Sequence, residues 1–254
     1  GNMTIARANP CVVVVFDELN QDDLVEILKN PNNPVILSKR QDFRAYDIDI
    51  KFEEVALHKI AELAAEQKTG ARGLVSAIEK VLIPFEKHLP STSIRQLLVT
   101  PELVEDPQKA LIALKDESNG TLLKERFDTE AKKEFEDLKA FVASKSDDLK
   151  RVSGLELYDR RFGFIVDIYL KRVTDINSAV EELVEMHNQI KETETSLHKK
   201  LEIKISFDDS AIDELIKESI HTQEGVEKLT YELGKKLEYG LKLIKDRSGE
   251  DQFE

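Results

Sequence analysis

Along the first hundred residues, short apolar runs alternate with helical stripes, which are segments whose apolar residues recur every three or four positions. The run CVVVVF at 11–16 is β-branched and short, which predicts a buried strand. Asn20 then precedes a helical stripe, so we expect it to cap a helix that the segment NPNNP, at 30–34, brings to an end. The apolar positions of that helix are Leu24, Ile27 and Leu28.

A strand and two helices are predicted next. The segment YDIDIKF at 46–52 alternates apolar and polar residues, as a half-buried strand does. A helix follows, and Gly70 is expected to be the left-handed residue just after its end. A second helix then leads to a strand at 97–100. The two core faces are Ala56, Leu57, Ile60, Ala61 and Ala64, then Leu74, Ile78, Val81, Leu82, Phe85 and Leu89.

Helical stripes dominate the chain from about Asp106 onward. One stripe runs from Phe127 to Val142 and another from Ile176 to Ile190. The run FGFIVDIYL at 162–170 is read as a core strand, in preference to an exposed partner-binding patch. Because glycine and proline are sparse, residues 106–160 are interpreted as a helical connector.

An ungapped internal repeat relates two segments that lie 155 residues apart, as Phe52 and Phe207 do. Gly70 falls on Gly225 at the same offset, and the apolar positions of both helices correspond. The second copy is expected to stop before any equivalent of the 97–100 strand. The predicted fold is therefore α+β and predominantly helical, with two similar units of helices on a short sheet at 1–105 and 161–254, joined by the connector.

Composition and charge exclude several classes of function. The formal net charge is −13, which disfavours nucleic-acid binding because phosphate neutralisation requires a cationic face. The sequence has no apolar run of 18 residues, so no membrane partner is expected and the predicted location is cytoplasmic. A single cysteine, Cys11, excludes an internal disulfide, and the five histidines lack paired metal-ligand spacing, so no metal site and no catalytic residue are predicted.

Residues 68–74 read KTGARGL, and together with the segments at 12–35, 48–74 and 89–104 they resemble the small C-terminal domain of ClpX-type AAA+ unfoldases. The resemblance covers roughly residues 10–105. It implies that Arg72 is the sensor-2 arginine, presented to ATP or ADP phosphates by a turn containing Gly70, Ala71 and Gly73. It also implies a large ATPase domain, neighbouring subunits of a hexameric ring, and protein clients or a peptidase as partners.

The chain contains no GxxxxGK[ST] phosphate loop, so the large domain is expected to be absent and the chain alone should not hydrolyse ATP. Independently of the resemblance, Arg72 is an unusual residue for its position, because a cation in the first turn of a helix opposes the helix dipole. The second copy has Glu227 there, which is favourable. An exposed arginine paired with a carboxylate is the structural alternative. A non-enzymatic assembly or adaptor module that reuses the small-domain fold is the alternative function.

Overall fold

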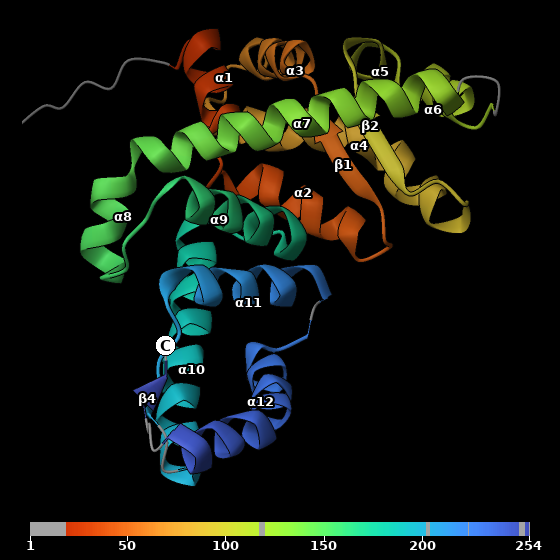
Figure 1. Ribbon diagram of the computed structural model, residues 1–254. Helices are drawn as coiled ribbons and strands as arrows, with labels where there is room; N and C mark the ends of the chain where they lie inside the picture. Colours follow the sequence, from red (N-terminus) through yellow and green to blue (C-terminus); the bar gives the residue numbers. More distant parts are fainter. Residues whose placement is uncertain (1–18, 117–119, 202–203, 223, 249–251, 254) are drawn as a thin grey trace, which may run out of the picture.

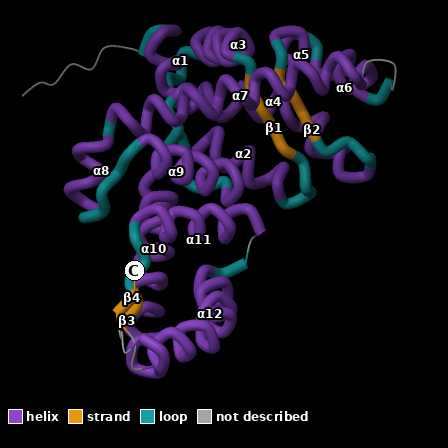
Figure 2. Tube along the Cα trace, viewed as in Figure 1, coloured by secondary structure: helices purple, strands orange, loops and turns teal. Residues whose placement is uncertain are grey.

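The computed structural model describes residues 19–116, 120–201, 204–222, 224–248 and 252–253. The predicted α+β, predominantly helical class is confirmed (Figures 1 and 2). In the first half, the elements are α1 (Gln21–Lys29), α2 (Pro34–Arg44), β1 (Asp49–Phe52), α3 (Glu54–Glu66), α4 (Ala71–His88), a 3-10 turn (Leu89–Ser91), β2 (Gln96–Val99), α5 (Pro101–Glu105) and α6 (Pro107–Leu114). The second half contains α7 (Gly120–Ser144), α8 (Ser146–Ser153), α9 (Asp159–Arg172), α10 (Ile176–Leu201), β3 (Lys204–Ile205), α11 (Asp209–Thr222), α12 (Val226–Ser248) and β4 (Gln252–Phe253).

Asn20 caps α1 as predicted, through a reciprocal capping box. The Asp23 amide donates to Asn20 Oδ1 over 3.0 Å, and the Asn20 amide donates to Asp23 Oδ2 over 2.9 Å. The NPNNP segment ends α1 at Lys29, but it also starts α2, which the apolar pattern did not predict. Asn33 caps that second helix and Pro34 occupies its first position, where a missing amide proton has no cost.

A parallel two-stranded sheet, β1 and β2, lies inside the first hydrophobic core. Ile50 pairs with Leu97 and Phe52 with Val99, and these residues are buried against the core that α1, α3 and α4 share. The predicted core faces of α3 and α4 are all buried. Parallel strands need a crossover connection, and α3 and α4 supply it.

The other face of the sheet is covered by α7, which lies across both strands (Figure 1). Lys51 and Leu98 point to this face, and both are buried. The strand predicted at 46–52 is confirmed at Asp49–Phe52, but its half-buried character is wrong: three of the four residues of β1 are buried, and Tyr46 lies outside the strand and is exposed. The reason is the packing of α7, whose Glu134 lies 83 positions after Lys51 in the chain, and local alternation cannot reveal such a contact.

A second hydrophobic core contains the C-terminal half of α7 with α9, α10, α11 and the start of α12. Phe162–Leu170 lies within α9 and is not a strand, so that prediction is wrong. A short apolar run suits a buried helix as well as a buried strand, and α9 buries residues on several of its sides. Since α7 contributes to this core, it does more than connect; the domain boundaries at 105 and 161 stay predictions.

The NPNNP segment also attaches the first core to the second. The Tyr169 hydroxyl donates to the Pro31 carbonyl over 3.0 Å, and the Ile176 amide donates to Asn32 Oδ1 over 2.9 Å. Gln41 of α2 donates to the Val173 carbonyl over 2.9 Å. The turn between α1 and α2 therefore accepts hydrogen bonds from α9 and from the first turn of α10, and these bonds hold the two cores together.

A second pair of parallel strands lies near the end of the chain, where Lys204 pairs with Gln252 and Ile205 with Phe253. The expectation that the second copy stops before a second strand is therefore wrong. The residues between Asp246 and Phe253 are mostly polar, so no apolar run marks this strand. The predicted strand at 11–16, and Cys11 with it, lies outside the described residues.

Candidate functional site

The turn between α3 and α4 holds the four residues that the resemblance assigns to nucleotide. Lys68 has a φ of 50° and Gly70 a φ of 59°. Lys68, not Gly70, therefore takes the left-handed position after α3, and the prediction for Gly70 is corrected. Gly70 is instead the residue immediately before α4. No side chain caps the N-terminus of α4 with a hydrogen bond. This conformation suits a residue without a Cβ.

Gly73 is required for the close approach of α4 to the end of α3. A Cβ built on Gly73 would lie 2.7 Å from the Ala64 carbonyl oxygen and 3.1 Å from Thr69 Oγ1. The backbone carbonyl cannot move away without disturbing the last turn of α3. Gly73 therefore positions the start of α4, and with it the neighbouring residues Ala71 and Arg72.

Arg72 is exposed in the first turn of α4, a turn without an acidic residue. No hydrogen bond or ion pair joins it to any residue within the described ranges. The alternative of a paired surface arginine thus finds no partner there. Its guanidinium group and the unsatisfied amides of the helix end have the same sign, and both attract an anion.

The corresponding turn of the second copy differs in chemistry. Glu227 lies in the first turn of α12, where its charge favours the helix dipole. Lys228 stands where the first copy has Gly73, and it is exposed and paired with Glu224 over 2.6 Å. Gly225 has no positive φ, in contrast to Gly70. The second turn therefore lacks both the arginine and the positive-φ glycine of the first.

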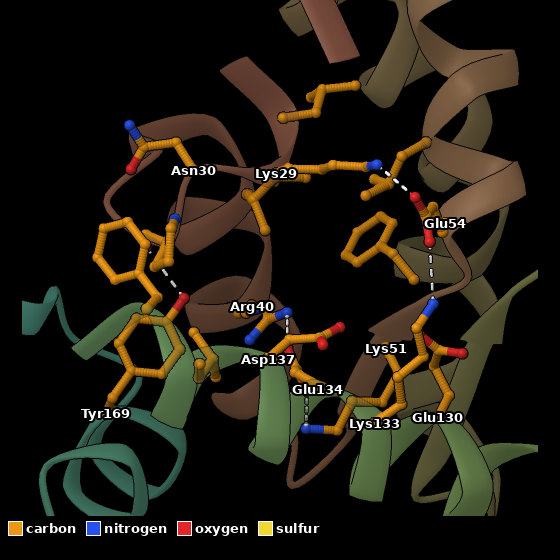
Figure 3. Close-up of a pocket in the computed structure, with 17 residues that line it drawn as sticks. Lys29, Asn30, Arg40, Lys51, Glu54, Glu130, Lys133, Glu134, Asp137 and Tyr169 are labelled. Carbon is orange, nitrogen blue, oxygen red and sulfur yellow. Dashed lines mark hydrogen bonds and ion pairs between the residues drawn. The ribbon is translucent and has the colours of Figure 1, made fainter. Parts of the chain in front are cut away.

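A cavity of about 330 Å³, not predicted from the sequence, lies where α7 and α9 meet the first core (Figure 3). One wall comes from α1, α2, β1 and α3, and the other from α7 and α9. Its lining is apolar at Leu28, Ile36, Phe52, Leu57, Leu138, Phe141 and Tyr169, and charged at Lys29, Arg40, Lys51, Glu54, Glu130, Lys133, Glu134 and Asp137.

Two groups of ion pairs border this cavity, and in each one carboxylate binds two cations (Figure 3). Glu54 pairs with Lys29 and, over 3.0 Å, with Lys133; these hydrogen bonds lower the pKa of Glu54 to about 2. Glu134 pairs with Arg40 and, over 2.6 Å, with Lys51. Burial alone would raise the pKa of Glu134, but the two cations hold it below its ordinary value.

Other candidate chemistry finds little support in the structure. Across the residues that the structure describes, no group of three or more His, Cys, Asp or Glu side chains could hold a metal ion. Within the same ranges, no helix is both long enough and apolar enough to cross a bilayer. His187 is half-buried on α10, where burial lowers its pKa; it belongs to the predicted apolar stripe.

Comparison with known proteins concerns the first half of the chain. Residues 19–85 match the family model for the C-terminal, D2-small domain of ClpB protein. The ATP-dependent Clp protease ATP-binding subunit ClpX of Treponema denticola is 33% identical over 108 residues, which is 42% of this chain and 26% of that protein. The match thus spans about a quarter of the relative's length. Residues 19–85, which include the α3–α4 turn, thus match a C-terminal small AAA+ domain of the ClpX/ClpB type.

Proposed function

We propose that this chain is the C-terminal portion of a Clp-type AAA+ ATPase, in which Arg72 contacts the phosphates of ATP or ADP bound to a large ATPase domain. The observation that carries the proposal is an exposed arginine without a described partner, in the first turn of a helix. The relative's name supports the nucleotide, because it is described as an ATP-binding subunit.

In this proposal the small domain moves with nucleotide state and bridges neighbouring subunits of a ring, hexameric by family resemblance, in the cytoplasm. ATP hydrolysis by the ring then drives unfolding or remodelling of client proteins, with or without a peptidase. Gly70 provides the positive φ before α4, and Gly73 allows α4 to pack close to α3. The chain alone supplies no phosphate loop and is expected to be inactive.

The test uses this chain joined to its large ATPase domain. Arg72→Ala should weaken the nucleotide response by about tenfold or more, since a charge-assisted phosphate contact is lost. Lys80→Ala is the matched control, because Lys80 is also an exposed cation on α4. Wild-type ATP turnover and nucleotide affinity in the Arg72→Ala protein would contradict the sensor role.

A non-enzymatic adaptor is the second candidate, and the second unit favours it. Asp49 and Lys204, Glu54 and Asp209, and Ala71 and Val226 begin equivalent elements, and each pair is 155 residues apart. We infer a duplication in which the second copy, with Glu227, does not contact nucleotide. The reading frame upstream of Met3 separates the candidates: a phosphate-loop motif supports the ATPase, and a start codon at Met3 supports the adaptor.

A further inference from the structure

The cavity between the two cores is separate from the α3–α4 turn and has no part in the nucleotide proposal. Its volume of about 330 Å³ lies within the usual range for small-molecule sites, which often form where two packed units meet. Phe52 and Leu57 line it from the first core, and Phe141 and Tyr169 from α7 and α9. These side chains offer an apolar, partly aromatic surface to a ligand.

The cations that line the cavity have ion-pair partners, whereas two of its carboxylates do not. All four cations of the lining are paired: Lys29 and Lys133 with Glu54, and Arg40 and Lys51 with Glu134. Glu130 and Asp137, by contrast, form no hydrogen bond or ion pair with any described residue. They stand two turns apart on the wall that α7 contributes (Figure 3).

Glu130 is the more confined of these two carboxylates. Its side chain is half-buried, and this burial raises its pKa more than the charge of the nearby Lys133 lowers it; the neighbouring carboxylates add to the increase. Asp137 is exposed at the cavity's edge. A cationic ligand would supply the missing partner. An anion would meet two unpaired carboxylates, and the cations of the lining are already in ion pairs, although the buried Nε of Arg40 has no hydrogen-bond partner among the described residues.

We propose that this cavity binds a small amphipathic amine. Its ammonium group pairs with Glu130, its apolar body lies against Phe52, Leu57 and Phe141, and Asp137 attracts it to the opening. Aromatic side chains near a cation add to the attraction, and the apolar lining accepts an aromatic or branched body. The inference rests on charge complementarity and on the cavity, and is independent of any nucleotide role.

The experiment is a titration of the folded chain with phenethylamine, followed by calorimetry and by backbone amide NMR shifts. We expect saturable binding, with shifts concentrated at residues 52–57 and 130–141. The anion 3-phenylpropionate has the same shape and the opposite charge, and should bind at least about tenfold more weakly.

Substitutions on α7 test which carboxylates bind the amine. Glu130→Gln, alone and combined with Asp137→Asn, should weaken phenethylamine binding by about tenfold or more and leave the fold intact, because neither carboxylate holds a described partner. Glu136→Gln is the control, since Glu136 is an exposed carboxylate of the same helix. The proposal is overturned by absence of saturation at about 10 mM amine, by equal binding of 3-phenylpropionate, or by unchanged affinity in Glu130→Gln. Tighter binding of L-phenylalanine than of phenethylamine would also overturn it, because a carboxylate site at Lys29 and Lys133 would then explain the cavity.

Discussion

At the scale of the residue, Arg72 is expected to matter for nucleotide and not for folding. Arg72→Glu copies Glu227 of the second unit and reverses an unfavourable charge in the first turn of α4. Helix-end charges are worth about 0.3–1 kcal/mol, so thermal unfolding of the chain should show an unchanged or slightly raised Tm. A large fall in Tm would mean that Arg72 is a structural ion-pair residue, and the sensor assignment would lose its physical support.

Substitution of Gly73, in contrast to substitution of Arg72, is expected to lower the stability of the folded chain. Replacing glycine by alanine within a helix normally stabilises it by about 1 kcal/mol, but at Gly73 the new Cβ would meet the Ala64 carbonyl at 2.7 Å. Gly73→Ala should therefore destabilise the chain by about 1–3 kcal/mol in urea unfolding. Gly240→Ala is the control, because nothing lies within 4 Å of its added Cβ inside α12. Equal effects of the two substitutions would contradict the close-packing role.

At the scale of the element, Glu134 is what joins α7 to α2 and β1. Its carboxylate neutralises Arg40 and the buried Lys51, so Glu134→Gln leaves Arg40 without a carboxylate partner among the described residues and Lys51 with Asp49 alone, 3.8 Å away. Removing one member of a buried ion cluster costs about 3–5 kcal/mol, and we expect a loss in that range at pH 7. Urea unfolding measures it, and Glu136→Gln on the exposed face of α7 should change little.

The stability that Glu134 contributes is also expected to depend on pH, because it requires the charged carboxylate. The folded-state pKa of Glu134 lies below its ordinary value of 4.5, so its contribution is complete above that pH. It is lost as the pH falls through the lowered pKa, because the carboxylate then takes up a proton in the folded state as well. The stability gap between wild type and Glu134→Gln should therefore shrink below about pH 4.5. A gap independent of pH would show that its charge is not what stabilises the contact.

At the scale of the whole molecule, the described chain has two hydrophobic cores, and a buried ion pair lies between two helices of the second. Arg161 and Asp213 are each 1% exposed and join α9 to α11, with Nε and Oδ1 2.9 Å apart. Tyr158 donates to the other Asp213 oxygen over 2.5 Å; burial and this hydrogen bond raise the pKa of Tyr158 to about 12, so the hydroxyl keeps its proton.

Asp213→Asn should open the second core before the first. The loss of charge leaves Arg161 buried beside a neutral amide, with Asp209, over 2.9 Å, as its remaining carboxylate partner, and we expect a cost of about 1–3 kcal/mol. Amide hydrogen exchange should accelerate in α9 and α11 while α3 and α4 keep their protection. Glu214→Gln removes an exposed partner of the neighbouring Arg160 and should leave exchange near wild type. Uniform acceleration across both cores would show that the molecule opens as one unit.

Prediction from sequence succeeded where a segment's own residues decide its structure. Asn20 caps α1 through atoms three residues away, and the core faces of α3 and α4 follow from helical periodicity. The KTGARGL segment also carried the small-domain assignment, which the family match at 19–85 supports. The role of Arg72 in nucleotide binding stays a prediction, because its ligand would belong to another domain.

The sequence by itself therefore determined the helical character, the α1 cap and the two buried helix faces, because each depends on neighbours within a turn or two. Only the tertiary structure decided that Lys51 is buried, that 162–170 is a helix and that a cavity lies where α7 and α9 meet the first core. Lys51 meets its partner Glu134 from a helix that is 83 positions further along the chain. Such long-range pairs leave no local periodicity, since the partner's identity depends on how the finished elements pack.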